Sequence, residues 1–163
     1  MADGKAVRES VSEYSELALP NDANQLGNVL GGKVMHLVDL AAALAAMRHA
    51  RLPVVTLAVD SLRFLQPVHI GELIVLRSSV NRVFHTSMEV GVRVITEDLT
   101  TGTRRHTCSA YLTFVALDES GKPAPVVPVI PETDEEQRRY REAGERREYR
   151  LLHRSAGASP RGV

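Results

Sequence analysis

The chain has 163 residues, of which 44% are hydrophobic and 25% are charged, with 20 basic and 20 acidic side chains. This length and composition are typical of one globular domain with a core of its own. Because the formal net charge is zero, no overall basic field attracts nucleic acid. The single cysteine, Cys108, excludes a disulfide within the chain, which fits a reducing compartment.

The sequence shows neither a secretion signal nor a membrane span. Its first residues lack the apolar core of a signal peptide. The most apolar stretch, residues 37–47, is about half of the roughly 20 residues that a membrane helix needs. We therefore expect a cytoplasmic protein that contacts neither membranes nor nucleic acid.

The first third of the chain predicts one long helix. Residues 1–7 are expected to be a frayed start and residues 8–18 an edge strand. Residues 19–32 predict a loop, because they are rich in Pro, Asn, Asp and Gly. From Gly31 to about His49, apolar residues recur with helical spacing on both sides of the helix. A helix that is apolar almost all round is expected to be buried.

The middle of the chain, after Pro53, changes to the alternation that strands show. The turn Asp98–Gly102 links two of these segments directly, so the strands are expected to be antiparallel. Four strands are predicted, over residues 54–60, 72–83, 86–97 and 104–117.

The last third predicts a charged helix. Residues 118–132 carry four prolines and are expected to have no regular structure. A capping box that starts at Thr133 predicts a helix over about 133–151. Residues 1–152 are interpreted as one domain, and residues 153–163 as a disordered tail.

These elements predict an α+β fold, in which an antiparallel sheet wraps around a long central helix and a C-terminal helix follows. The edge of that sheet and the second apolar side of the helix would remain uncovered. Such surfaces predict a dimer or a larger homo-oligomer.

The stretch from Asn24 to Asp39 suggests a site. Gly31 and Gly32 open the helix, where free backbone N–H groups can bind a carbonyl oxygen or an oxyanion; they could also be a simple tight junction. Asp39 lies within the helix without an obvious local cation, so it is functional, pairs with a distant arginine, or reaches solvent. Asn24 could donate to a carbonyl, hold a water or stabilise a turn.

The spacing of these residues limits how they can cooperate. Gly31 and Asp39 are eight residues apart, which is about 12 Å along a helix. One small carbonyl group cannot contact both. If both serve one reaction, the acid must come from a neighbouring subunit, as an antiparallel pair of helices across a dimer interface would allow.

Residues 19–48, LPNDANQLGNVLGGKVMHLVDLAAALAAMR, resemble the active-site segment of the hotdog-fold acyl-CoA hydrolases. The resemblance is to the cytosolic and brain-type acyl-CoA thioesterases and their bacterial relatives. It continues through residues 54–74, 85–98 and 111–133, about three quarters of the chain in all. The spacing of the asparagine, the Gly-Gly pair and the aspartate is specific only together with F-x-x-P-V-x-x-G at residues 64–71.

The resemblance implies a hotdog fold and the hydrolysis of fatty acyl-CoA to free fatty acid and CoA. It implies no metal and no cofactor, since CoA is part of substrate and product. Asp39 and Asn24 would act from opposing subunits: Asp39 would activate water or attack directly to give a mixed anhydride, and Asn24 would orient the carbonyl or the water. The N–H of Gly31 or Gly32 would stabilise the oxyanion. A hexamer built as a trimer of dimers is also implied.

The phosphates of CoA require cations and donors at the mouth of the site. Relatives often have glycine and arginine where this chain has Phe84 and His85, which weakens charge recognition by His85 near neutral pH. The two arginines on the last helix could clamp a phosphate or form a solvated helix face. The candidates for substrate binding are Arg63, Arg82, His85, Thr86, Ser87, Arg146 and Arg147.

Two rival functions remain open. A hotdog acyl-thioester hydratase or dehydratase would use a histidine with an acid, whereas this site offers Asp39 with Asn24. A non-catalytic acyl-CoA-binding regulatory protein would bind CoA esters without turnover. No Cys, His and Asp cluster has metal-ligand spacing, and Cys108 is expected to be a small core residue. Acyl-chain length is not encoded visibly.

Overall fold

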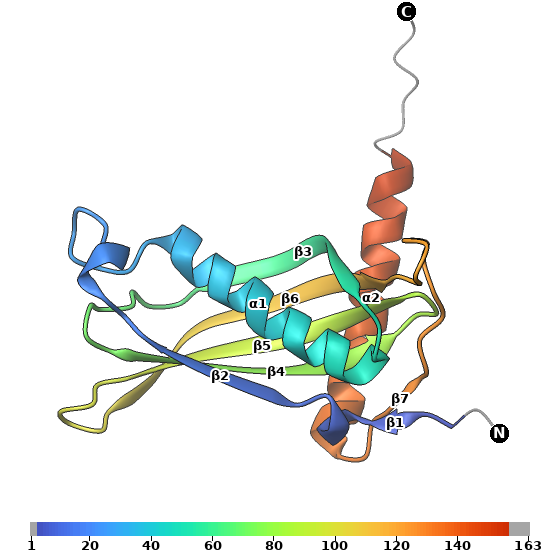
Figure 1. Cartoon of the computed structure of the whole chain (residues 1–163), viewed down its shortest axis with the longest axis horizontal. Coiled ribbons are helices and arrows are strands. Elements are labelled where there is room, and N and C mark those ends of the chain that lie inside the picture. The colour runs from blue at the N-terminus through green and yellow to red at the C-terminus, as the bar shows by residue number, and fades with distance from the viewer. Residues whose placement is uncertain (1–2, 157–163) are drawn as a thin grey trace, which may run out of the picture.

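A computed structural model describes residues 3–156. A five-stranded antiparallel sheet curves around one long helix, α1 (Gly31–Ala50), as Figure 1 shows. The sheet order is β2-β4-β5-β6-β3, with β2 at Ser12–Leu17, β4 at Leu73–Val83, β5 at Ser87–Glu97, β6 at Arg104–Ala116 and β3 at Val54–Phe64. This is the α+β arrangement predicted from the sequence.

The core lies between α1 and the concave face of the sheet. Four alanines of α1, Ala41, Ala42, Ala45 and Ala46, are fully buried and allow the strands to approach the helix closely. The alternate residues from Met88 to Val94 on β5 and from Cys108 to Ala116 on β6 face this helix and are buried.

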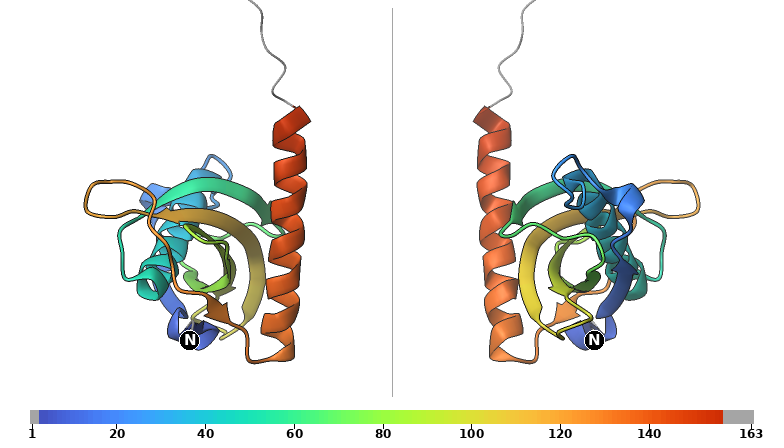
Figure 2. Two further views of the ribbon diagram at one scale, coloured as in Figure 1. Left: turned by 90° about the vertical axis from the view of Figure 1, so that its right-hand side faces the viewer. Right: turned by 90° about the vertical axis from the view of Figure 1, so that its left-hand side faces the viewer.

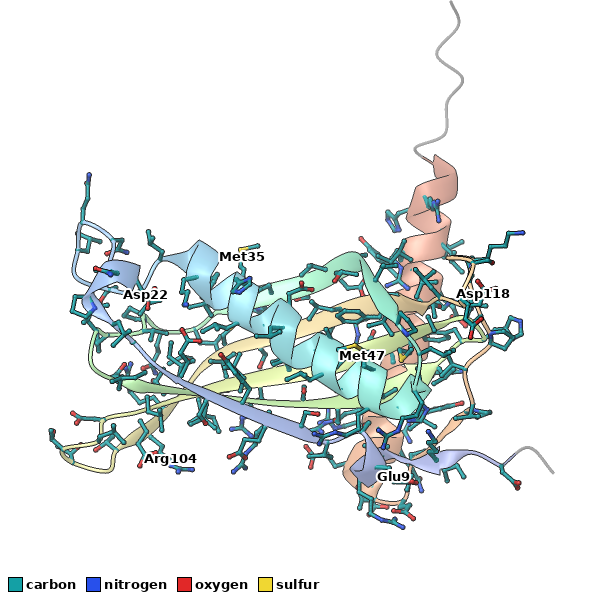
Figure 3. All side chains as sticks on the ribbon, viewed as in Figure 1. Glu9, Asp22, Met35, Met47, Arg104 and Asp118 are labelled. Carbon is teal, nitrogen blue, oxygen red and sulfur yellow. The ribbon has the colours of Figure 1, made fainter. Side chains whose placement is uncertain are left out.

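The opposite side of α1 is uncovered in the single chain. Met35, Leu40 and Met47 are exposed there, and Figure 3 labels Met35 and Met47 on this side. This is the expected arrangement, in which one sheet covers one side of the helix and leaves its second apolar side for a partner. The neighbouring strand, β3, is an edge strand with Leu57 at 61% and Val59 at 48% exposure. We call Met35, Leu40, Met47, Leu57 and Val59 the apolar surface.

A second helix, α2 (Asp134–Ala156), lies against the convex face of the sheet, so that the sheet separates the two helices (Figure 2). Its predicted capping box is confirmed, because Glu136 N donates to Thr133 Oγ1 at 3.1 Å and Thr133 N donates to Glu136 Oε2 at 3.1 Å. The helix extends to Ala156. The predicted disordered tail, residues 153–163, is therefore wrong for residues 153–156, which are helical. The rest of that predicted tail lies outside the described residues.

Both apolar and charged contacts join α2 to the sheet, and Tyr140 packs against the hydrophobic core. Ala143 is the helix's buried apolar residue. Arg146 makes a two-pronged pair with Glu89, from Nη2 to Oε1 at 2.7 Å and from Nε to Oε2 at 3.0 Å. Glu89 is 1% exposed and also accepts from Asn81 Nδ2 at 3.0 Å. Arg150 pairs with Asp60 farther along the helix.

Two segments expected to lack regular structure pair with each other. β1 (Lys5–Ala6) runs parallel to β7 (Val129–Ile130), and a 3₁₀ turn, η1 (Val7–Glu9), follows β1 with Val7 buried. A further 3₁₀ turn, η2 (Pro20–Asp22), lies in the predicted loop. The predictions of a frayed start and of an irregular 118–132 segment are wrong where these strands form. Each strand depends on a partner more than 100 residues away, which local patterns do not reveal.

Candidate active site

Asp39 presents its carboxylate at the apolar surface without a cation. Thr56 Oγ1, on β3, donates a 2.7 Å hydrogen bond to Asp39 Oδ1. No lysine, arginine or histidine among residues 3–156 lies within ion-pair distance of Asp39. Arg48, one local candidate for a partner, instead donates to Val11 O at 2.5 Å. A partly exposed acid that is held by one hydroxyl keeps Oδ2 available for chemistry.

Thr56 is a site residue that sequence reasoning missed. Threonine favours strands, so within the segment VVTLAVD it is consistent with an ordinary strand residue. Its contact with Asp39 arises because β3 runs beside α1, which only the fold determines. A signal was present all the same: a helical aspartate without a local cation needs a hydrogen-bond donor from another element.

The start of α1 leaves two backbone amides open. Lys33 N and Val34 N both donate to Leu30 O, whereas Gly31 N and Gly32 N have no acceptor among the described residues. A Cβ on Gly32 would meet nothing within 4 Å, and one on Gly31 would come no closer than 3.7 Å to the Phe64 ring. Packing within the chain therefore does not require glycine at these two positions. They leave the helix start open to another molecule.

Asn24 stabilises its own turn, one of the roles expected from the sequence, and keeps a hydrogen-bond donor free. Its Oδ1 accepts from Leu26 N at 2.9 Å and from Asn28 N at 3.1 Å, which stabilises the turn. This arrangement fixes the amide, and Nδ2 has no acceptor among the described residues. Asn24 can therefore act as a hydrogen-bond donor to a ligand, and its oxygen is not available to accept from one.

Asn24 and the start of α1 share one cavity of about 340 Å³. Its size falls within the range of small-molecule sites. Asp39 is not among its lining residues, and eight residues of helix, about 12 Å, separate Asp39 from Gly31. Within one chain, Asp39 and the cavity at the start of α1 are thus separate. The lining residues are Asn24, Asn28, Val29, Gly31, Val34, Phe64, Leu65, Gln66, Pro67 and Val68.

Some predicted CoA-binding residues gather around the turn between β4 and β5. The guanidinium carbons of Arg82 and Arg147 lie 5.4 Å and 4.7 Å from the centre of the Phe84 ring. Arg82 also stacks on Tyr140, at 4.3 Å. Neither arginine has a carboxylate partner among the described residues. His85 lies exposed at the tip of this turn with a φ of 126°, a backbone conformation that favours glycine.

Other predicted CoA-binding residues lie elsewhere or are already engaged. Arg146 is bound to Glu89, and its guanidinium lies 3.7 Å from the centre of the Tyr111 ring. Arg63 pairs in register with Ser109, whose side chain lines the convex face, so Arg63 lies on the face away from α1. Thr86 and Ser87 contribute carbonyl groups, which accept from Ala116 N and Phe84 N.

The remaining titratable groups point to no further catalytic centre. Burial raises the pKa of the Cys108 thiol to about 11, so this core residue stays protonated near neutral pH. Among residues 3–156, no group of three or more His, Cys, Asp or Glu side chains could hold a metal ion. No helix in this part of the chain is long and apolar enough to cross a membrane.

Several known proteins that this chain resembles in sequence and structure are named acyl-CoA hydrolases or thioesterases. YkhA of Bacillus subtilis strain 168, named an uncharacterized acyl-CoA thioester hydrolase, is 40% identical over 159 residues, which are 96% of this chain and 92% of that protein. The crystal structure of an apo-hexameric acyl-CoA thioesterase matches with 44% identity and a TM-score of 0.88, over 94% of this chain and 97% of that chain.

An acyl-CoA hydrolase from Staphylococcus aureus, solved in complex with butyryl-CoA, CoA and CoA disulfide, matches with 36% identity and a TM-score of 0.87, over 93% of each chain. Variants of that enzyme with an aspartate, a threonine or an asparagine replaced by alanine have been solved as well. The thioesterase superfamily matches residues 26–103 of this chain. The chain therefore belongs to the thioesterase superfamily, as a hotdog-fold relative of the acyl-CoA thioester hydrolases.

Proposed function

We propose that this chain hydrolyses the thioester bond of fatty acyl-CoA at composite sites between two protomers. The observation that carries the proposal is the carboxylate of Asp39, held by Thr56 and left without a cation at an exposed apolar surface. A soluble protein covers such a surface with a partner. An acid at that position would then face the partner chain.

The two halves of the site fit together if two α1 helices lie antiparallel across the interface. Asp39 of one chain would then approach the cavity of the other, where the Gly31 amide and Asn24 Nδ2 are free. The edge strand β3 lies next to α1 and would pair with its copy in the same contact. Each dimer would hold two such sites.

The spacing of three residues supports these assignments. Fifteen residues separate Asn24 from Asp39, and seventeen separate Asp39 from Thr56. The asparagine, aspartate and threonine that were each replaced by alanine in the Staphylococcus aureus enzyme have the same separations along that chain. We propose that Asn24, Asp39 and Thr56 likewise belong to one functional set here.

The reaction then proceeds with side chains and backbone amides. The substrate carbonyl accepts hydrogen bonds from Asn24 Nδ2 and from the amides of Gly31 or Gly32. Asp39 of the partner protomer takes a proton from water, which attacks the carbonyl carbon, or its Oδ2 attacks directly and the mixed anhydride is then hydrolysed. The amides stabilise the oxyanion, which collapses as the carbon–sulfur bond breaks and the CoA thiolate leaves. The products are free fatty acid and CoA.

The phosphates of CoA are assigned to the turn between β4 and β5. Arg82 and Arg147 flank Phe84 there as two partly buried guanidinium groups, without carboxylates to neutralise them. His85, Thr86 and Ser87 remain proposed contacts of the turn itself. Arg146 and Arg63 are the weaker candidates, since one is bound to Glu89 and the other lies on the far face.

We also propose a homohexamer, a trimer of dimers, and a cytoplasmic location. The hexameric thioesterase with 44% identity supports the assembly. A cytosolic acyl coenzyme A thioester hydrolase of Rattus norvegicus, 33% identical over 138 residues, supports the location. The domain is proposed to include α2, which packs on the sheet through buried polar contacts.

Release of free thiol from butyryl-CoA and palmitoyl-CoA tests the function. Wild-type protein should release CoA, and Asp39→Asn should lower turnover by roughly 100-fold or more without loss of the assembly. Loss of the enoyl absorbance of crotonyl-CoA without thiol release would instead indicate a hydratase. Tight binding of CoA esters with no turnover over hours would indicate a non-catalytic binding protein. If Asp39→Asn leaves the activity unchanged, Asp39 has no role in the reaction.

A further inference from the structure

A second and larger cavity, of about 560 Å³, lies on the convex face of the sheet, on the far side from α1. Strands β4, β5 and β6 form its floor, and the first turns of α2 form one wall. It shares no lining residue with the cavity that contains Asn24. Four arginines line it, and Glu135 is its one acidic lining residue among those described. The arginines are Arg77, Arg93, Arg138 and Arg139.

Two of these arginines face each other directly in the sheet. Arg77 on β4 is the register partner of Arg93 on β5, so their side chains project from the same face at the closest cross-strand separation. Like charges placed directly opposite destabilise a sheet. Glu13 pairs with Arg77 at 2.9 Å, whereas Arg93 has no carboxylate partner among the described residues. The row Glu13–Arg77–Arg93–Ser109 therefore carries one excess positive charge.

Helix α2, which forms the wall of the cavity, adds two arginines whose carboxylate partners are exposed. Arg138 pairs with Glu142 at 2.9 Å, and Arg139 pairs with Glu135 at 2.5 Å. These pairs are about a third or more exposed, and exposed ion pairs are weak. The guanidinium groups can therefore turn toward a ligand at little cost.

The floor of the cavity offers polar groups that are almost completely buried. Ser79 is 8% exposed, and its hydroxyl has no hydrogen-bond partner among residues 3–156. Asn81 is 3% exposed and donates to Glu89, which leaves its Oδ1 without a donor in the same part of the chain. Gly91 lies between Ser79 and Tyr111 in the sheet, and the amide of Asn81 packs over it, 2.9 Å from where a Cβ would stand. The polar side chains of Ser79 and Asn81 line the cavity and keep hydrogen-bonding capacity for a ligand.

We propose that this cavity binds a small phosphate-bearing anion. Arg93 and Arg77 contact the phosphate oxygens from the sheet, Arg138 or Arg139 contacts them from α2, and Ser79 donates from the floor. The volume of about 560 Å³ accommodates an anion with more than one phosphate. The inference goes beyond the thioesterase reaction and does not depend on it. Because the ligand bridges α2 and the sheet, its binding stabilises the docking of α2.

Calorimetric titration of the assembled full-length protein with inorganic pyrophosphate tests the proposal. Arg93→Gln removes an exposed arginine with no ion pair, so the fold should persist while the affinity falls at least about tenfold. Arg141→Gln is the matched control, because Arg141 is an exposed arginine of α2 that does not line the cavity. It should bind pyrophosphate as the wild type does.

Further titrations separate the cavity from the other phosphate-binding possibilities. Asp39→Asn and the double variant Arg82→Gln/Arg147→Gln should retain the Arg93-dependent binding, which keeps the proposal distinct from the proposed CoA contacts. Tighter binding of adenosine diphosphate than of pyrophosphate would identify a nucleotide, and equal binding would identify phosphate alone. The proposal is overturned if the wild type does not bind, if another copy of the chain fills the cavity in the assembly, or if Arg93→Gln and Arg141→Gln weaken binding equally.

Discussion

Thr56 on β3 donates its hydroxyl hydrogen to Asp39 on α1, with 2.7 Å between the two oxygens. This bond joins the central helix to the edge strand at the surface where a second chain would dock. It selects one carboxylate oxygen and leaves the other free. In the proposed reaction, Thr56 therefore positions the carboxylate of Asp39.

Thr56→Val keeps the shape of the side chain and removes the hydroxyl. A hydrogen bond to a charged group contributes about 1.5–3 kcal/mol, so kcat for butyryl-CoA should fall at least about tenfold, with a smaller change in KM. Thr56→Ser should restore most of the rate because it restores the donor. Steady-state kinetics of both variants check this. Equal rates for the valine and serine variants would show that the hydroxyl has no part in positioning Asp39.

Arg146→Ala should destabilise the protein by about 3 kcal/mol, because it leaves Glu89, which is 1% exposed, as a buried charge without a cation. Removing both charges together, with Glu89→Gln and Arg146→Gln, should cost less than the sum of the two single changes. Urea unfolding of the single and double variants measures this coupling. Additive losses would mean that the pair does not hold α2 to the sheet.

His85→Gly should stabilise the protein by about 1 kcal/mol, because a non-glycine residue with a φ of 126° is strained. Thr86→Gly in the same turn has no positive φ to relieve and should not stabilise. Thermal unfolding of the two variants separates strain at His85 from a general effect of glycine in the turn. A lower Tm for His85→Gly would contradict the account.

The stability of the fold should fall below about pH 6.5 because of His49. Burial at the end of α1 lowers the pKa of this imidazole from 6.5, although Nε2–H donates to Val127 O at 2.9 Å. Lys5 lowers the pKa further, and Glu9 opposes it. The unfolded chain therefore takes up a proton that the folded chain resists. The stability that the neutral His49 side chain contributes to the fold is fully present above pH 6.5. It is lost as the pH falls toward the lower pKa of His49 in the folded state.

His49→Gln can keep the donor to Val127 O and does not titrate, so its free energy of unfolding should change less between pH 7.5 and pH 5.5 than that of the wild type. Urea titrations at the two pH values give the comparison. An identical change in both proteins would assign the effect to other groups.

The helix, the four long strands and the capping box at Thr133 could be predicted because each follows a local pattern of apolar spacing or turn residues. Asn24, Gly31, Gly32 and Asp39 could be proposed from their residue types and from their positions in the loop before α1 and along α1. Thr56 could not, because its role depends on which strand lies beside the helix. The short β1–β7 pairing could not be predicted either, because it depends on a contact between distant parts of the chain. Arg146 was a candidate for phosphate binding because of its charge, and its pairing with Glu89 of β5 could not be predicted from local sequence.

Mixing two inactive variants tests the composite site most directly. Asn24→Ala and Asp39→Asn, each inactive alone, are unfolded together and reassembled at equal concentrations. If Asn24 and Asp39 act from opposing chains, each mixed dimer contains one site with both residues intact, and thiol release should return to roughly a quarter of the wild-type rate, because about half of randomly formed dimers are mixed. If the two residues act within one chain, no site is intact and the mixture should stay inactive, which would contradict the account.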